Sequence, residues 1–347
     1  MTHACVDQYL LDRLVCPRDQ SVLNFRNGAL HCVQEHRYPV IDDVPVMLVD
    51  DAPPTFEQAT GALGRPQKGS GDPRARHLYL DTVGISDEQK QGVLELLDTQ
   101  SSIDPVVAYL VAATNGMLYQ KLVGTLPAYP IPEVPVPPGH GLFLDIGCSW
   151  GRWTIAAQRR GYTAIGIDPS LGAVMAARRV ARQLGVAARF LVGDARYLPF
   201  APGQFERAFS YSVIQHFSRA DARRAIAEIG RVLKPGGHSH VQMPTRYGVR
   251  CLYHQARRGF SDGAGFDVRY WSLPELRELF GSRIGQTTLD VDCYFGIGLQ
   301  ESDANLMSGP RRAVLRASSL LKAAQRSMPF LIQAADSVYV SSTKAAA

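Results

Sequence analysis

Short apolar runs alternate with amphipathic segments through the second half of the chain. Runs of strand length lie at 142–146, 163–167, 189–192, 207–211 and 238–243, separated by segments with helical spacing of apolar residues. This alternation is typical of a parallel sheet that helices cover on both faces. Later runs at 288–294 and 337–341 can supply two more strands. We therefore predict an α/β fold over residues 139–347, with a doubly wound, mostly parallel sheet of seven strands.

The first part of the chain has a different pattern. Residues 1–52 contain short strand-like runs and an Asn27-Gly28 hairpin signal, which predict a small β-rich domain. Residues 53–76 are rich in proline, glycine and polar side chains, as linkers are. Residues 77–138 hold two helical segments and then a run of prolines that cannot be helical. We interpret this third region as helices followed by an extended strap.

The composition is that of a globular protein, with 347 residues of which 46% are hydrophobic and 20% charged. The net charge of +5 permits an anionic partner such as RNA without indicating one. No apolar stretch reaches the length of a membrane span, and the start has no signal-peptide pattern. We therefore expect a cytoplasmic protein without stable membrane insertion, whose six cysteines are free thiols.

A glycine-bearing turn follows the first strand of the predicted sheet. Gly147 and Gly151 allow the backbone to approach a ligand closely, because neither carries a Cβ atom. Ser149 stands where a dinucleotide fingerprint needs its second glycine, so the turn fits a nicotinamide cofactor poorly. Asp168 ends the second strand, where a carboxylate can accept both hydroxyls of a ribose. Asp194 ends the third strand, where its carboxylate or a backbone amide can contact an adenine edge.

These strand ends, together with 205–216 and 233–237, resemble the class I S-adenosylmethionine-dependent methyltransferases of the type 11-like group. The resemblance covers roughly residues 139–245 and departs from the family at Ser149 and Glu206. It implies a Rossmann-like fold, S-adenosyl-L-methionine as cofactor, and an enzyme that transfers a methyl group. The resemblance also assigns roles to single residues. It implies that Asp145 orders the turn and that Gly147 and Gly151 bracket the methionine moiety. It further implies that Asp168 holds the ribose, that Asp194 and Ala195 flank the adenine, and that Ser210 belongs to the cofactor site.

Methyl transfer needs an aligned nucleophile, and a base accelerates it when the acceptor is a hydroxyl or a protonated amine. His216 follows the fourth strand and is our candidate base, with Tyr211 as a second catalytic candidate. The alternative is that His216 packs at a helix start and hydrogen-bonds the backbone. By analogy with relatives, the helices of 77–138 form a lid in which Asn115 and Tyr119 are candidate contacts. Arg246, Arg250 and Arg269 either bind an anionic acceptor or are solvated surface charges.

The N-terminal domain carries a partial metal motif. Cys16-x2-Asp19 and Cys32-x3-His36 resemble a zinc ribbon whose second cysteine has become aspartate. Ribbons of this kind accompany or activate methyltransferases, and some ribosomal-RNA guanine methyltransferases carry one. Because this ligand set is unusual, we favour metal loss and a structural role, and we assign no metal while leaving zinc open.

Three functions compete on the sequence alone. The leading one is methyl transfer to a small-molecule acceptor such as a metabolite, a glycan or a lipid precursor. The second is an RNA methyltransferase that uses the ribbon for substrate recognition, and the third is a non-catalytic scaffold or regulator with a cofactor fold. A basic helix at 311–326 has too modest an apolar face to indicate a membrane surface. The acceptor atom and the oligomeric state stay open.

Overall fold

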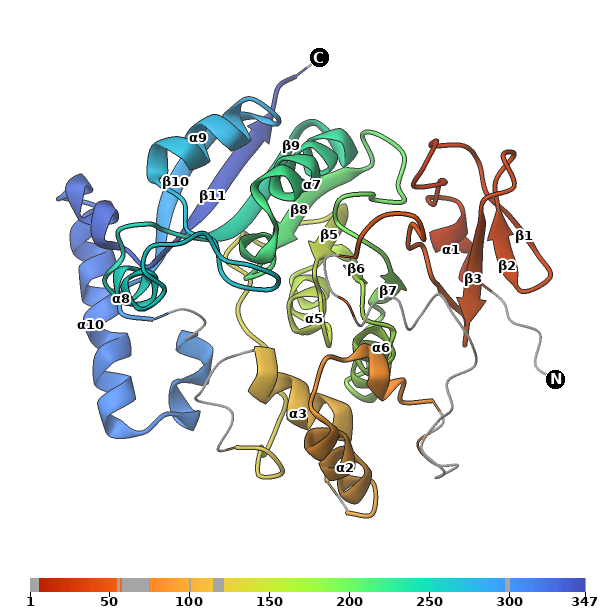
Figure 1. The fold of residues 1–347 in the computed structure, drawn as a ribbon, viewed down its shortest axis with the longest axis horizontal. Coiled ribbons are helices and arrows are strands. Elements are labelled where there is room, and N and C mark those ends of the chain that lie inside the picture. Colours follow the sequence, from red (N-terminus) through yellow and green to blue (C-terminus); the bar gives the residue numbers. More distant parts are fainter. Residues whose placement is uncertain are drawn as a thin grey trace. The chain divides into compact units, whose positions relative to one another are not determined.

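The structure is a computed structural model, and it describes residues 6–54, 57, 75, 77–99, 101–114, 122–296 and 300–346. The chain divides into two compact units, Met1–Gln204 and Phe205–Ala347 (Figure 1). Within the described ranges, no helix is long and apolar enough to cross a membrane.

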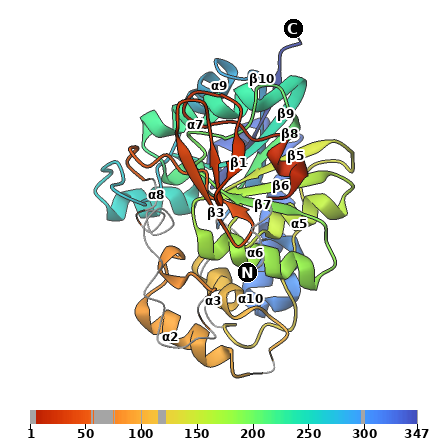
Figure 2. The same cartoon turned by 90° about the vertical axis from the view of Figure 1, so that its right-hand side faces the viewer.

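Three parallel strands form the centre of the first unit. They are β5 (Leu142–Ile146), β6 (Thr163–Asp168) and β7 (Arg189–Val192), with Leu144 opposite Ile165 and Ile167 opposite Leu191. Helices α5 (Arg152–Arg159) and α6 (Leu171–Gln183) pack against them (Figure 2). The strands are almost continuously apolar because helices cover them, as the alternation in the sequence predicts.

The N-terminal residues fold as a four-stranded antiparallel sheet in the order β1-β2-β3-β4. Its elements are α1 (Gln8–Leu11), β1 (Asn24–Arg26), β2 (Ala29–His31), β3 (Arg37–Ile41) and β4 (Val44–Pro45). Asn27 and Gly28 have φ angles of 52° and 72°, which confirms the predicted tight hairpin. Directly after β4, Val46 pairs in parallel with Val192, and the Met47 amide donates a 2.8 Å hydrogen bond to the Val192 carbonyl. The N-terminal sheet therefore protects the edge of β7.

Helical segments precede the central strands, as predicted. They are η3 (Leu80–Thr82), α2 (Asp87–Leu96) and α3 (Pro105–Thr114). Ser86 and Gln89 form a capping box at the start of α2. Asp104 caps α3 and pairs with Arg179 of α6 at 2.6 Å, which anchors α3 to α6. Leu122 lies in a turn, in which its carbonyl accepts from the Thr125 amide.

The second unit contributes four strands. Its strands are β8 (Phe205–Ser210), β9 (Leu233–Pro244), β10 (Gly285–Cys293) and β11 (Ser337–Lys344). β8 and β9 are parallel, whereas β11 is antiparallel to both β9 and β10. The remaining elements are η4 (Ile214–His216), α7 (Arg219–Val232), α8 (Val249–Arg257), α9 (Leu273–Gly281), η5 (Glu301–Leu306), α10 (Gly309–Gln325) and η6 (Pro329–Ala334).

The strands of the first unit lie in the order β5-β6-β7, and those of the second unit lie in the order β10-β11-β9-β8. β5, β6 and β7 run parallel in the first unit, β8 and β9 run parallel in the second, and β11 is antiparallel to both β9 and β10. The predicted Rossmann-like α/β class is therefore confirmed.

Candidate cofactor site and catalytic groups

The turn between β5 and α5 has an unusual backbone conformation. Gly147, Ser149 and Gly151 all have positive φ angles, of 74°, 47° and 82°. The amides of Gly147 and Cys148 donate to the Ile167 carbonyl at 2.8 and 3.1 Å, which fastens the turn to the end of β6. Ser149, where the family often has glycine, therefore adopts the left-handed conformation that glycine favours.

Asp168 explains how Ser149 holds that conformation. Its Oδ2 accepts a 2.9 Å hydrogen bond from the Ser149 amide, and its Oδ1 accepts one of 2.9 Å from the Ser170 amide. Ser170 in turn caps α6 by accepting from the Ala173 amide. Burial raises the pKa of Asp168 to about 6. Asp168 thus orders two turns, and each of its oxygens keeps a second lone pair for a ribose hydroxyl.

Asp145 lies beneath the same turn. It is 1% exposed, and its Oδ2 accepts a 2.6 Å hydrogen bond from the Thr154 hydroxyl on α5. Burial raises the pKa of Asp145 to about 7. This contact connects the end of β5 to α5 across the turn, so its geometry suits the ordering role that we expect of Asp145.

Three side-chain atoms at this turn lack hydrogen-bond partners among the described residues. Ser149 Oγ, Trp150 Nε1 and Arg152 Nε are buried and have no hydrogen-bond partner within the described ranges. Arg152 is only 6% exposed, and its guanidinium carbon lies 5.2 Å from the centre of the Trp153 ring, so Nε is the donor that lacks a partner. These unused donors make the turn a candidate site for an acidic group of a ligand. From the sequence we noted Ser149 only as a replacement of glycine and did not single out Trp150 or Arg152, although Arg152 directly follows Gly151 at a helix start, where anions bind.

The loop after β7 is held by an ion pair. Asp194 Oδ2 lies 2.7 Å from Arg196 Nη2, and Asp194 Oδ1 accepts from the Arg196 amide at 2.8 Å. Arg196 Nη2 also donates to the Pro53 carbonyl at 2.6 Å. Asp194, Ala195 and Arg196 are all buried. The carboxylate that we expect beside the adenine is therefore held in one orientation by its neighbour.

His216 lies in η4, after the end of β8 in the second unit. Its Nδ1 is 2.7 Å from the Phe266 carbonyl, which can only accept, so Nδ1 carries the proton in the neutral ring. Its Nε2 is then the accepting atom, 3.2 Å from the side-chain nitrogen of Gln215. The ring stacks on Phe266 at 4.1 Å, and burial lowers the pKa of His216. His216 therefore bonds the backbone through Nδ1 and keeps a basic nitrogen at Nε2, and its role as a base stays a prediction.

Two buried amides accompany His216. Gln242 Oε1 accepts from the Ser212 amide at 3.0 Å, and Gln215 Nε2 donates to Ser212 Oγ at 2.9 Å. The other atom of each amide, Gln242 Nε2 and Gln215 Oε1, is buried without a partner within the described ranges. One donor and one acceptor are thus unused around Ser212, which has a φ of 62°.

The remaining candidates are engaged within the second unit. Tyr211 donates to Asp292 at 3.4 Å and accepts from Gln300 at 2.6 Å, and Ser210 is fully buried at the end of β8. Arg269 donates to the His216 carbonyl at 2.6 Å, so it positions this loop. Arg246 pairs with Glu275 at 3.1 Å. The lid candidates Asn115 and Tyr119 lie outside the described residues.

Comparison with known proteins identifies the class. Residues 143–237 match a protein family described as a methyltransferase domain. With the Rossmann-like fold and the cofactor turn, this match defines a class I S-adenosylmethionine-dependent methyltransferase domain, and S-adenosylmethionine is its cofactor.

Individual relatives share this domain. The demethylmenaquinone methyltransferase of Thermus thermophilus is 34% identical over 147 residues, 40% of this chain and 66% of that protein. The biotin biosynthesis bifunctional protein of Cellvibrio japonicus is 38% identical over 98 residues, 28% of this chain and 18% of that protein. A methyltransferase structure from Methanosarcina mazei has a TM-score of 0.43 at 19% identity, covering 60% of this chain and 94% of that chain. The chain spans about half or less of the first curated relatives that it matches.

Proposed function

We propose that this protein transfers the methyl group of S-adenosylmethionine to a small-molecule acceptor, such as a metabolite, a glycan or a lipid precursor. The observation that carries the proposal is the cofactor turn, in which three buried donors lack partners next to the ordered carboxylate of Asp168. A protein that used this fold only as a scaffold would have no need for buried donors without partners.

Each chemical group of the cofactor has candidate partners in the first unit. Ser149, Trp150 and Arg152 hold the methionine carboxylate, and Asp168 accepts from the ribose hydroxyls. The loop of Asp194 and Ala195 borders the adenine. When bound, the cofactor supplies a methyl group on a sulfonium, which is electrophilic without further activation.

His216 acts as the general base for a hydroxyl or amine acceptor. With the cofactor bound, its sulfonium would give up the methyl group to the acceptor atom, and Nε2 of His216 would take the proton that this atom loses. The Phe266 carbonyl accepts the Nδ1 proton at 2.7 Å and stabilises the imidazolium that forms. The unused atoms of Gln215 and Gln242 orient a small polar acceptor.

The name of the Thermus relative supports the acceptor class, because demethylmenaquinone is a small molecule. Within this proposal, residues 139–347 form the catalytic domain, residues 77–138 a lid with its strap, residues 53–76 a linker, and residues 1–52 a structural domain. The five cysteines that the structure describes form no disulfide, which supports a cytoplasmic site of action.

The test uses purified protein, methyl-labelled S-adenosylmethionine and a cell extract separated into RNA and small-molecule fractions. Label in the small-molecule fraction supports the proposal, and label in RNA replaces it with RNA methylation. Asp168→Ala is the negative control. Glu278→Gln removes an exposed acid from α9, outside the proposed site and lid, and should label like the unaltered protein. If neither fraction is labelled although the protein binds the cofactor, the protein is a scaffold or regulator.

A further inference from the structure

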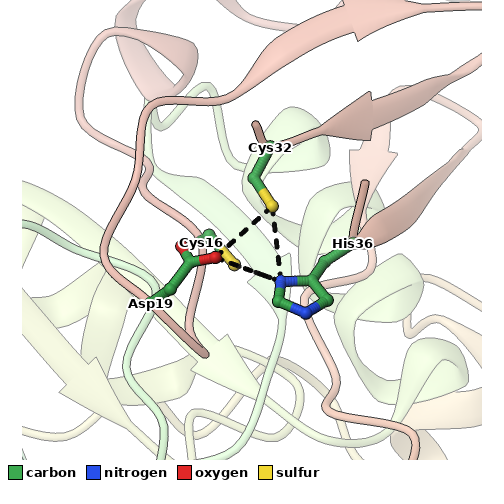
Figure 3. A group of neighbouring side chains, drawn as sticks. All are labelled: Cys16, Asp19, Cys32 and His36. Atoms are coloured by element: carbon green, nitrogen blue, oxygen red, sulfur yellow. Dashed lines mark hydrogen bonds and ion pairs between the residues drawn. The ribbon is translucent and has the colours of Figure 1, made fainter. Parts of the chain in front are cut away.

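Four side chains of the N-terminal domain point toward one another (Figure 3). They come from two turns, and one potential ligand atom from each lies within 4.8 Å of the other three. We propose that Cys16, Asp19, Cys32 and His36 bind one zinc ion. The ion is structural, because four protein ligands leave no open position for a substrate.

The distances agree with a tetrahedral metal site. His36 Nδ1 lies 3.4 Å from Cys16 Sγ, 3.3 Å from Cys32 Sγ and 3.2 Å from Asp19 Oδ2. Cys32 Sγ lies 3.6 Å from Asp19 Oδ2. Bond lengths of about 2.3 Å for zinc–sulfur and about 2.0 Å for zinc–nitrogen and zinc–oxygen place tetrahedral ligands about 3.3 to 3.5 Å apart. The four measured separations match this range to within about 0.2 Å.

Hydrogen bonding alone cannot account for the arrangement. A ring nitrogen offers either one proton or one lone pair, so His36 Nδ1 can serve one partner. Two sulfur atoms and one carboxylate oxygen nevertheless surround it within 3.4 Å. A cation at the centre satisfies all four groups at once, since thiolate, carboxylate and imidazole are each zinc ligands.

Neighbouring groups orient the ligands. The Ser21 amide and hydroxyl both donate to Asp19 Oδ1, at 2.9 and 2.5 Å, which leaves Oδ2 directed at the cluster. The Tyr38 hydroxyl lies 3.2 Å from Cys16 Sγ. Such outer contacts are a regular feature of metal sites. Asp19 therefore takes the place of the missing cysteine with one defined oxygen atom.

Backbone hydrogen bonds order both turns that carry the ligands. In the first turn the Gln20 amide donates to the Cys16 carbonyl at 2.9 Å, and in the second the Glu35 amide donates to the Cys32 carbonyl at 3.1 Å. Gln20 and Glu35 have φ angles of 63° and 60°. The hydrogen bonds of each turn therefore hold its two ligand residues in place, and zinc binding requires no change in the backbone conformation. Two thiolates and an imidazole select zinc over magnesium or calcium, which prefer oxygen ligands.

Metal analysis of the full chain tests this proposal independently of methyl transfer. We expect one zinc ion per chain after dialysis against metal-free buffer. X-ray absorption at the zinc edge should give two sulfur neighbours at about 2.3 Å and two lighter neighbours at about 2.0 Å. A zinc-free protein that takes up no zinc from added zinc chloride overturns the proposal, and so does a shell without sulfur.

Variants locate the ion. Cys32→Ser and Asp19→Asn should lose most of the bound zinc, whereas the matched changes Cys251→Ser and Asp12→Asn should retain it, because those residues lie outside the cluster. Asp19→Cys should retain zinc with three sulfur neighbours, which tests the site even if Cys32→Ser fails to fold. Two sulfur neighbours in Asp19→Cys, or full zinc content in Cys32→Ser, would exclude this ligand set.

Discussion

Arg196 donates a 2.6 Å hydrogen bond through Nη2 to the carbonyl of Pro53, which follows the N-terminal domain in the chain. The same guanidinium holds the carboxylate of Asp194 in the loop after β7. Arg18, which lies between the metal-cluster residues Cys16 and Asp19, pairs with Asp51 at 2.6 Å. A continuous set of contacts in the first unit therefore links the N-terminal domain to the loop that we assign to the adenine.

The Arg196–Asp194 pair should be important for stability. Both side chains are less than 10% exposed, so Arg196→Met leaves a buried carboxylate without its partner. We expect the free energy of unfolding to fall by about 3–5 kcal/mol, measured by urea unfolding. The double variant Asp194→Asn with Arg196→Met should recover much of this loss, because no uncompensated charge remains.

An exposed pair in the same unit provides the control. Arg26 and Glu35 are 2.6 Å apart, but their side chains are 52% and 73% exposed. Arg26→Met should therefore change the free energy of unfolding by at most about 1 kcal/mol. Equal losses in Arg26→Met and Arg196→Met would show that burial of the Asp194 pair does not matter.

Cofactor affinity should depend on pH through Asp168. Burial raises its pKa to about 6, and the ionised form is the one that accepts from ribose hydroxyls. Affinity for S-adenosylmethionine should therefore be full above pH 7 and fall as pH decreases through 6, by up to about tenfold per pH unit. Calorimetric titrations at pH 5, 6 and 7 measure this dependence.

Asp168→Asn separates this group from others that titrate nearby, Asp145 in particular. The amide keeps one acceptor oxygen but directs an NH2 group at a backbone amide, either that of Ser149 or that of Ser170. We expect cofactor affinity at pH 7.5 to fall by about 10- to 100-fold, since hydrogen bonds to charged groups contribute about 1.5–3 kcal/mol. The decrease in cofactor affinity between pH 7 and pH 5 should become shallower in this variant. An unchanged pH profile would show that another acid causes the decrease.

Gly151 should tolerate no side chain. Its φ is 82°, and an added Cβ would lie 2.8 Å from the Phe190 ring and 3.0 Å from the Ala177 Cβ. Gly185 has a similar φ of 64° but open space around it. Gly185→Ala should cost about 1–2 kcal/mol of unfolding free energy from the backbone alone. Gly151→Ala should cost about 1–3 kcal/mol more from overpacking, and Phe190→Leu in that background should restore part of the difference.

The strand ends could be predicted from the sequence because the apolar runs are long and regular. The order of the runs places Asp145, Asp168 and Asp194 at the ends of β5 and β6 and just after β7, where ligands of such sheets bind. Their partners were not predictable. The Ser149 amide reaches Asp168 only because a non-glycine residue adopts a positive φ, which no residue type at that position signals.

Long-range contacts also escaped prediction. The pairing of Val46 with Val192 joins segments from opposite ends of the first unit, and a two-residue β4 carries no pattern that specifies it. The metal cluster could be predicted only in part. Asp19 in place of a cysteine weakens the zinc motif in the sequence. The contacts by which Ser21 orients the Asp19 carboxylate are recognised only in the folded chain.

His216 allows the sharpest test of the proposed chemistry. Because burial lowers its pKa below the ordinary value of 6.5, the ring is neutral at pH 7, and the acidic limb of kcat/KM should lie below pH 6.5. His216→Asn should lower kcat by about 10²–10⁴-fold, leave cofactor affinity within about twofold, and abolish that limb. The exposed His238 on β9 supplies the control, since His238→Asn should keep both the rate and the limb. A His216→Asn enzyme with an unchanged kcat would mean that the acceptor reacts without a base, as a carbanion-like carbon or a thiolate does, and that His216 serves only to hold the loop of Phe266.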